Sequence, residues 1–152
     1  MKKKPTILLI EDNRDDQRFV KLALEYLEID ANLEVVDDAR HGMRYLMNEG
    51  EYEHAETPDL IIMDINMPRV SGIEMLDLMH VDERIGLIPV IMLTTSDASE
   101  DVNACYAKGC NAFVTKPFGH KELLDKLNKL CAFWLDAAEL PTVSRPHAKA
   151  MA

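Results

Sequence analysis

Five polar side chains of this 152-residue chain follow short apolar runs and could do chemistry together. They are Glu11 and Asp12 after the first run, Asp64 after the third, Thr94 after the fourth and Lys116 after the fifth. Carboxylates that are brought together repel one another, and a hard divalent cation such as Mg²⁺, which takes oxygen ligands, relieves that repulsion. A carboxylate such as Asp64 can also attack phosphorus and form an acyl phosphate. Hydroxyl and ammonium groups could then bind the oxygens of the transferred group.

Each of these residues also has an ordinary structural interpretation. An acidic pair after a strand often begins a helix, where the macrodipole favours negative charge. A single aspartate at a strand end forms turns, a threonine caps helices, and a lysine before proline lies in a solvated loop. The chemical interpretation rests on the combination, because the groups follow four different apolar runs.

Short apolar runs alternate with segments of helical spacing along the chain. The runs occupy residues 7–10, 33–36, 60–63, 90–93 and 112–114. Four of them are typical of strands buried on both faces, and 33–36 alternates as an edge strand does. Strict alternation predicts an α/β fold with a doubly wound parallel sheet, because parallel strands need right-handed crossovers. The ligand site of such a sheet lies outside the carboxyl ends of its strands, where the five side chains stand.

Helix boundaries can also be predicted from single residues. Asp37 or Asp38 is placed to cap the second helix, and Ser96 or Ser99 to cap the fourth. Gly109 can take the left-handed conformation that ends the fourth helix.

Composition and charge exclude several classes of function. With 47% hydrophobic and 29% charged residues, the chain is typical of a globular protein. A formal charge of −10 disfavours binding to nucleic acid, which needs a basic surface. The run 7–10 is too short for a signal peptide, and no stretch could span a bilayer, so the expected location is cytoplasmic.

Three cysteines are present, at positions 105, 110 and 131. They form no C-x-x-C pair and are odd in number, which indicates a reducing compartment and neither a disulfide framework nor a zinc site. We expect them to be small residues of the core.

Four motifs resemble the receiver domains of two-component response regulators, and they occur in the same order. They are Leu9-Ile10-Glu11-Asp12-Asn13, Met63-Asp64-Ile65-Asn66-Met67-Pro68, Leu93-Thr94-Thr95-Ser96 and Val114-Thr115-Lys116-Pro117-Phe118. The resemblance covers residues 5–132. It implies a flavodoxin-like fold of five βα units with strand order 2-1-3-4-5. Residues 1–132 would form the receiver domain and 133–152 a C-terminal extension.

The resemblance also implies a role for each site residue. Asp64 would be the phosphoacceptor, and Thr94 and Lys116 would bind the phosphoryl oxygens. Phe113 would be a switch aromatic that turns inward with Thr94, although it could also be an ordinary core residue. The Lys116–Pro117 bond would be cis. The implied ligands of Mg²⁺, or of Mn²⁺, are Glu11, Asp12, Asp64 and the main-chain carbonyl of Asn66.

Output would come from a changed surface, because no DNA-binding domain follows the receiver. The last helix carries an apolar arc wider than one sheet face needs, which indicates an isologous dimer contact. The arc could also pack entirely inside the monomer. The connection 50–55 and the segment 132–135 resemble single-domain regulators paired with bacterial and cyanobacterial phytochromes. This resemblance implies a homodimer through the fourth helix, fifth strand and fifth helix together with the extension. The expected phosphoryl source is therefore a sensor histidine kinase, with a bacteriophytochrome as the candidate.

Two other functions compete with the switch. An aspartate-nucleophile phosphohydrolase would normally have its nucleophile after the first strand in an Asp-x-Asp motif, whereas this chain has Glu11-Asp12 there. A scaffold with a relict pocket is disfavoured by the presence of Asp64, Thr94 and Lys116. We therefore expect no enzyme activity beyond self-phosphorylation from small phosphodonors and slow autodephosphorylation.

Overall fold

A five-stranded parallel sheet forms the centre of the computed structural model, which describes residues 3–143. Its strands are β1 (Thr6–Ile10), β2 (Asn32–Val36), β3 (Leu60–Met63), β4 (Val90–Thr94) and β5 (Ala112–Thr115). Their order across the sheet is β2-β1-β3-β4-β5, and every neighbouring pair is parallel. The predicted α/β class, doubly wound and flavodoxin-like, is therefore confirmed.

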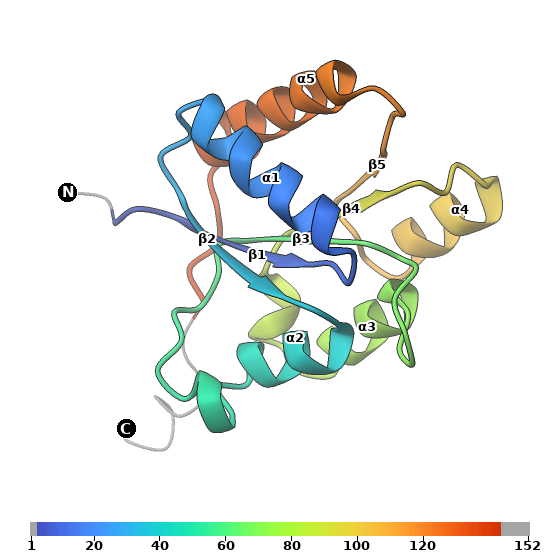
Figure 1. Ribbon diagram of the computed structural model, residues 1–152. Coiled ribbons are helices and arrows are strands. Elements are labelled where there is room, and N and C mark those ends of the chain that lie inside the picture. The colour runs from blue at the N-terminus through green and yellow to red at the C-terminus, as the bar shows by residue number, and fades with distance from the viewer. Residues whose placement is uncertain (1–2, 144–152) are drawn as a thin grey trace.

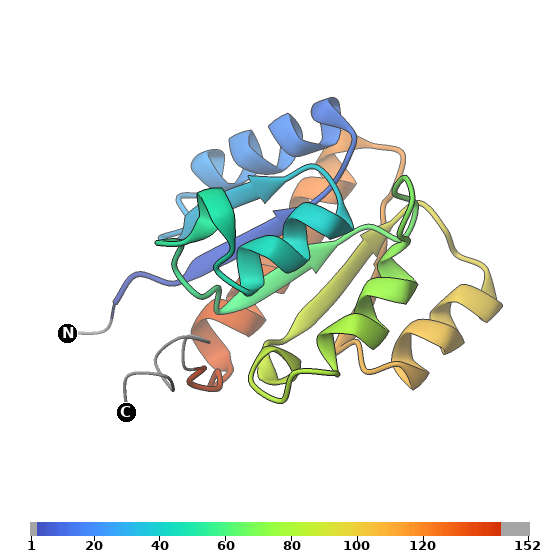
Figure 2. The same cartoon turned by 90° about the horizontal axis from the view of Figure 1, so that it is seen from below.

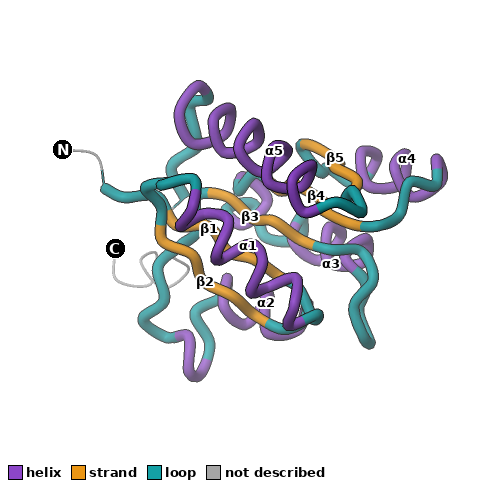
Figure 3. The backbone as a smooth tube through the Cα atoms, turned by 45° about the horizontal axis from the view of Figure 1, so that its top comes forward, coloured by secondary structure: helices purple, strands orange, loops and turns teal. Residues whose placement is uncertain are grey.

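Helices cover both faces of the sheet (Figure 1). They are α1 (Arg14–Tyr26), α2 (Ala39–Leu46), α3 (Gly72–Met79), α4 (Ser99–Ala107) and α5 (His120–Cys131). The helices α1 and α5 lie side by side over one face, whereas α2, α3 and α4 lie on the other (Figure 2 and Figure 3). Short 3₁₀ turns at Gly50–Tyr52 and Ile85–Leu87 complete the longer connections.

The two helical layers divide the side chains of the central strands between them. In β1, Leu8 and Ile10 pack with α2, α3 and α4, whereas Ile7 and Leu9 pack with α1 and α5. This follows from the strand geometry, in which successive side chains point to opposite faces. All residues of β1, β3 and β4 are buried, which explains why their sequences are continuous apolar runs.

The outer strands depart from that pattern. The strand β2 is an edge strand with mostly exposed residues, as its partial alternation predicted. The prediction that 112–114 is buried on both faces is wrong, because every residue of β5 is partly exposed. The cause is its place at the other edge of the sheet, where only β4 and the nearby helices cover it.

Two of the three predicted helix boundaries are correct. Asp38 caps α2, and its carboxylate accepts a hydrogen bond of 2.8 Å from the main-chain N–H of His41. Gly109 has a φ of 97°, the left-handed conformation expected after α4. The predicted serine cap of α4 is wrong, because Ala98 occupies the cap without a side-chain hydrogen bond. The hydroxyl of Ser96 instead donates to Asp101 at 2.6 Å.

The segment after α5 packs against the α1 and α5 layer, whereas Val143, the last described residue, packs against the opposite layer. After α5 a π-helical segment, Ala132–Ala137, brings Trp134 and Leu135 into partly buried positions on that layer. Phe133 is the exception, with 55% of its surface exposed. Most of the wide apolar arc is thus used inside the protein. Of the predicted extension, residues 144–152 lie outside the described residues.

The cysteines and the length of the helices can also be compared with the sequence-based expectations, for residues 3–143. All three cysteines are free and buried, as expected of core residues, and burial raises the pKa of each thiol to about 11. In this part of the chain no helix combines the length and apolar character that crossing a membrane requires.

Candidate functional site

The candidate site lies at the carboxyl edge of the sheet, where main-chain hydrogen bonds between neighbouring segments continue beyond the strands. The main-chain N–H of Asp64 donates to the carbonyl of Ile10 at 3.2 Å, and that of Glu11 donates to a carbonyl at the end of β2 at 3.1 Å. On the other side, the N–H of Lys116 donates to the carbonyl of Thr94 at 2.6 Å. These bonds fix the positions from which the polar side chains start.

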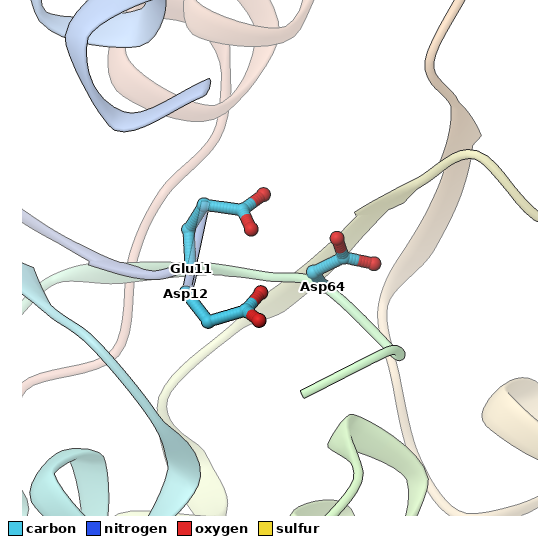
Figure 4. A group of neighbouring side chains, drawn as sticks. All are labelled: Glu11, Asp12 and Asp64. Atoms are coloured by element: carbon cyan, nitrogen blue, oxygen red, sulfur yellow. The ribbon is translucent and has the colours of Figure 1, made fainter. Parts of the chain in front are cut away.

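Three carboxylates meet at this edge. Glu11, Asp12 and Asp64 each offer an oxygen, and these oxygens lie within 4.8 Å of one another. The carboxyl groups of Glu11 and Asp12 both extend toward Asp64 (Figure 4). Glu11 is 3% exposed and Asp64 9% exposed, whereas Asp12 is exposed to solvent. Two of the three negative charges are therefore held away from water.

Lys116 balances part of this charge. Its ammonium donates to Glu11 at 2.6 Å, to Asp16 at 3.0 Å and to Asp64 at 3.2 Å. The Lys116 side chain is 8% exposed, so the contacts are shielded from solvent. The expected cis bond between Lys116 and Pro117 is wrong, because this bond is trans and the side chain reaches Glu11 and Asp64 in that conformation.

Protonation at the site follows from its burial and its excess negative charge. Burial raises the pKa of Glu11 to about 7, although the hydrogen bond and charge of Lys116 act in the opposite direction. Burial alone would lower the pKa of Lys116, but its contacts with Glu11 and Asp64 outweigh this and raise it. Both pKa values are therefore raised, as expected where carboxylates outnumber cations.

The donor set suits a small hard cation. Carboxylate oxygens within reach of one another are the ligands that Mg²⁺ uses, usually with a carbonyl and several waters. Asn66, whose carbonyl is a predicted ligand, lies two residues after Asp64, and its N–H donates to the Asp64 carboxylate at 3.3 Å. The residues present therefore fit Mg²⁺ or Mn²⁺.

The predicted switch residues lie on neighbouring strands. Thr94 ends β4 with none of its surface exposed, and its hydroxyl oxygen accepts a weak hydrogen bond of 3.4 Å from the N–H of Ser96. Phe113 is partly buried and packs against the α2, α3 and α4 layer. Its N–H donates to the hydroxyl of Tyr106 on α4 at 3.0 Å. This bond ties β5 to α4 at the residue predicted to switch.

Two contacts of the site were not foreseen from the sequence. Asp16 approaches Lys116 from the first turn of α1. Gln17 donates from its amide to the carbonyl of Glu11 at 2.5 Å and to Asp37 at 2.8 Å, and so fastens α1 to the strand end. The sequence feature that could have predicted these contacts is the helix cap at Asn13. It places residues 16 and 17 in the first turn of α1, above the strand ends.

Comparisons with known proteins agree with this geometry. The family model of the response regulator receiver domain matches residues 7–128. Response regulator Rcp1 of Synechocystis is 36% identical over 135 residues, which is 89% of this chain and 92% of that protein. The phosphorylated cyanobacterial phytochrome response regulator RcpA superposes with a TM-score of 0.87 at 34% identity, over 92% of this chain and 100% of that one.

A solved structure of Rcp1 in its Mn²⁺-bound form superposes with a TM-score of 0.85 at 36% identity, over 91% of this chain and 99% of that one. The match to the family model spans all four motifs at the strand ends, and these relatives extend the likeness over nearly the whole chain. The chain therefore belongs to the family of response regulator receiver domains, the phosphorylation-activated signalling switches of two-component systems.

Proposed function

We propose that Asp64 is the residue on which this switch is phosphorylated. The observation that carries the proposal is the double role of its carboxylate. The carboxylate belongs to the group of three that is suited to a cation, and its Oδ2 accepts a hydrogen bond from the buried ammonium of Lys116. A nucleophile for phosphoryl transfer needs positive charge on both sides, because the transferred group is itself negative.

The reaction is an in-line transfer from a phosphohistidine of a sensor kinase, the usual partner of receiver domains. An oxygen of ionised Asp64 forms a bond to phosphorus, and the bond between phosphorus and the imidazole nitrogen breaks. The electron pair of that bond stays on the nitrogen, which takes a proton from solvent, and Asp64 becomes an acyl phosphate. The ammonium of Lys116 and the hydroxyl of Thr94 then bind phosphoryl oxygens.

Glu11, Asp12, Asp64 and the main-chain carbonyl of Asn66 would hold Mg²⁺ or Mn²⁺. When bound, the cation supplies positive charge to the oxygens of the transferred group. The oxygen-only donor set supports this proposal, and so does the likeness to Rcp1, for which a Mn²⁺-bound form has been solved. Under this proposal Asp64 would bind the cation and also carry the phosphoryl group.

The signal would leave the site through Thr94 and Phe113. Phosphorylation adds negative charge and strong acceptor oxygens at the end of β4, which draw the Thr94 hydroxyl toward them. Thr94 is fully buried, so its movement must displace neighbours. Phe113 is partly buried on β5 and linked to α4 through Tyr106. The surface formed by α4, β5 and α5 is therefore the proposed output.

We further propose that this surface, with the extension 133–152, forms a homodimer and that the kinase is of the phytochrome type. β5 is an edge strand, and Tyr106 on α4 and Phe133 after α5 expose half or more of their surfaces. The names of the relatives support the second part, because RcpA and further solved neighbours are described as phytochrome or bacteriophytochrome response regulators.

Intact mass spectrometry with acetyl phosphate and Mg²⁺ tests the phosphoryl acceptor. The wild-type chain should gain one phosphoryl group, Asp64→Asn none, and the surface control Asp77→Asn one. Slow loss of the added group would show autodephosphorylation. No addition to the wild type would favour the relict scaffold, and rapid multiple turnover of the phosphodonor would favour the phosphohydrolase.

Sedimentation of the same samples tests the dimer. We expect the phosphorylated wild type to sediment as a dimer and Phe133→Ser to shift toward the monomer, because the exposed ring would lose its contact. Lys3→Ser, at an exposed side chain that precedes β1, should leave the sedimentation unchanged. A wild type that stays monomeric at all concentrations would contradict the dimer without affecting the assignment of Asp64.

A further inference from the structure

The ammonium of Lys116 has three hydrogens and three carboxylate partners, and the partners are not equivalent. Glu11 and Asp64 also belong to the group of oxygens suited to a cation. Asp16 lies outside that group, although it is 3.0 Å from the ammonium nitrogen. Asp16 is therefore the partner whose carboxylate is available to Lys116 alone.

The position of Asp16 is fixed by the helix that carries it. The side chain of Asn13 caps α1 and accepts a hydrogen bond of 3.0 Å from the main-chain N–H of Asp16. Gln17, the next residue, is bonded to the carbonyl of Glu11, so this first turn is fastened directly to the strand end. Asp16 thus approaches Lys116 from a rigid element, and its side chain is 41% exposed.

A lysine side chain needs such an anchor more than most groups. Its ammonium sits on a flexible stem of four carbons and loses considerable rotamer entropy when it is held in one place. Two of its hydrogens are directed to Glu11 and Asp16, which leaves the third directed to Asp64 Oδ2. That third direction is the one from which a phosphoryl oxygen on Asp64 would be bound.

We propose that Asp16 is a positioning residue, which holds the ammonium of Lys116 so that it points at the phosphoryl group on Asp64. The inference rests on the proposed function of Asp64 and adds a residue outside the four motifs. Asp16 lies outside the carboxylate group that is suited to a cation, and it would act only through Lys116.

The direction in which the affinity for a phosphoryl analogue changes when the Asp16 carboxylate is removed distinguishes positioning of Lys116 from a simple charge effect. Removing a carboxylate near an anion site reduces repulsion, so the charge effect alone would strengthen binding of a phosphoryl analogue. Loss of the anchor weakens it, because Lys116 must then be ordered by the analogue itself. Asp15 offers a matched control, since it lies in the same first turn and is exposed.

Calorimetric titration with beryllofluoride in saturating Mg²⁺ measures this directly. Asp16→Asn should bind the analogue about 1.5-fold to fivefold more weakly than the wild type, the range for a partly exposed charge pair. Asp15→Asn should bind as the wild type does or slightly more tightly. Equal affinities of Asp16→Asn and Asp15→Asn, or tighter binding by Asp16→Asn, would overturn the proposal.

Two further variants test whether Asp16 acts through Lys116. In a Lys116→Met background, Asp16→Asn should cause no additional weakening, because there is no ammonium left to position. Asp16→Glu should recover part of the affinity, and Mn²⁺ binding should be the same in Asp16→Asn and wild type. Additional weakening in the Lys116→Met background would contradict positioning.

The titration also separates this inference from the proposal on which it rests. If the wild type binds no beryllofluoride and takes no phosphoryl group from acetyl phosphate, both fail together. If the wild type binds and Asp16→Asn matches Asp15→Asn, the assignment of Asp64 stands and only the role of Asp16 is wrong.

Discussion

The two helical layers that enclose the sheet differ in the side chains they use. The buried residues of the α1 and α5 layer, such as Ile7, Leu24 and Leu127, are aliphatic apart from Cys131, and the layer contains no methionine among the described residues. The layer of α2, α3 and α4 contains all seven described methionines, five of them buried. The same sheet is therefore packed rigidly on one side and adaptably on the other.

The methionine-containing layer is also the layer next to the proposed moving parts. Phe113 and the loop that leads to α3 pack against it, and two adjoining surface hollows of about 320 and 300 Å³ lie between α2 and α3. Methionine is unbranched and fills irregular gaps, so it can follow a change of shape at modest cost. The aliphatic layer instead holds α1, which carries Asp16 and Gln17, in a fixed place.

The largest effect should come from a cavity in the aliphatic layer. Leu127 is fully buried on α5, and Leu127→Ala should lower the free energy of unfolding by about 2–5 kcal/mol, because neighbours in a rigid layer close the cavity only partly. Denaturant unfolding measures the loss. A loss below about 1 kcal/mol would show that this layer relaxes as readily as the other.

A smaller but more specific effect is expected where the methionine-containing layer meets the site. Gly72 begins α3, and a Cβ there would lie 2.2 Å from the main-chain carbonyl oxygen of Asp64, which cannot move alone. Gly72→Ala should lower the free energy of unfolding by about 1–3 kcal/mol and should slow phosphorylation, because the backbone of Asp64 must shift.

Gly42→Ala is the matched control on α2. Its Cβ would meet only the flexible tips of Ile10 and Met75, at 2.8 and 3.0 Å. It should cost clearly less than Gly72→Ala in denaturant unfolding and leave the phosphorylation rate by acetyl phosphate unchanged. Equal losses would mean that side-chain tips in this layer are as rigid as the backbone under the site.

Exchanging a methionine for a leucine should have little effect on stability. Met75 is fully buried against the sheet, and Met75→Leu conserves volume, so the expected loss is less than about 1.5 kcal/mol. The same denaturant experiment applies. A loss larger than that of Leu127→Ala would reverse the comparison between the layers.

The smallest effect concerns backbone strain in the loop between β3 and α3. Arg69 has a φ of 68°, a conformation that costs most side chains about 1–2 kcal/mol. Arg69→Gly should raise the free energy of unfolding because glycine removes this strain. The gain should be about 1 kcal/mol or less, because glycine also increases the entropy of the unfolded chain. Arg69→Asn should do the same to a smaller extent. Destabilisation by both variants would show that the arginine side chain makes compensating contacts.

The architecture and the central site residues could be predicted because they depend on local patterns. Runs such as 60–63 are apolar since both faces are covered, and parallel strands bring the residues after them to one edge. Glu11, Asp12, Asp64 and Lys116 therefore meet as expected.

Features that depend on how distant elements are placed could not be predicted. The contact between Asp16 and Lys116 joins residues 100 positions apart and requires a particular height of α1 above the sheet. The run 112–114 looks buried, yet its strand is an edge. Ser96 has the right residue type for a helix cap, but α4 begins at Ser99, so Ala98 occupies the cap position.

The most direct test of the central claim is to locate the phosphorylated residue chemically. After incubation with acetyl phosphate and Mg²⁺, borohydride reduces an acyl phosphate to an alcohol, so that the modified aspartate becomes homoserine and can be found by peptide mass spectrometry. We predict homoserine at Asp64 alone. Homoserine at Asp12 or Asp16, or at no position despite a gain of phosphoryl mass, would contradict the assignment of Asp64.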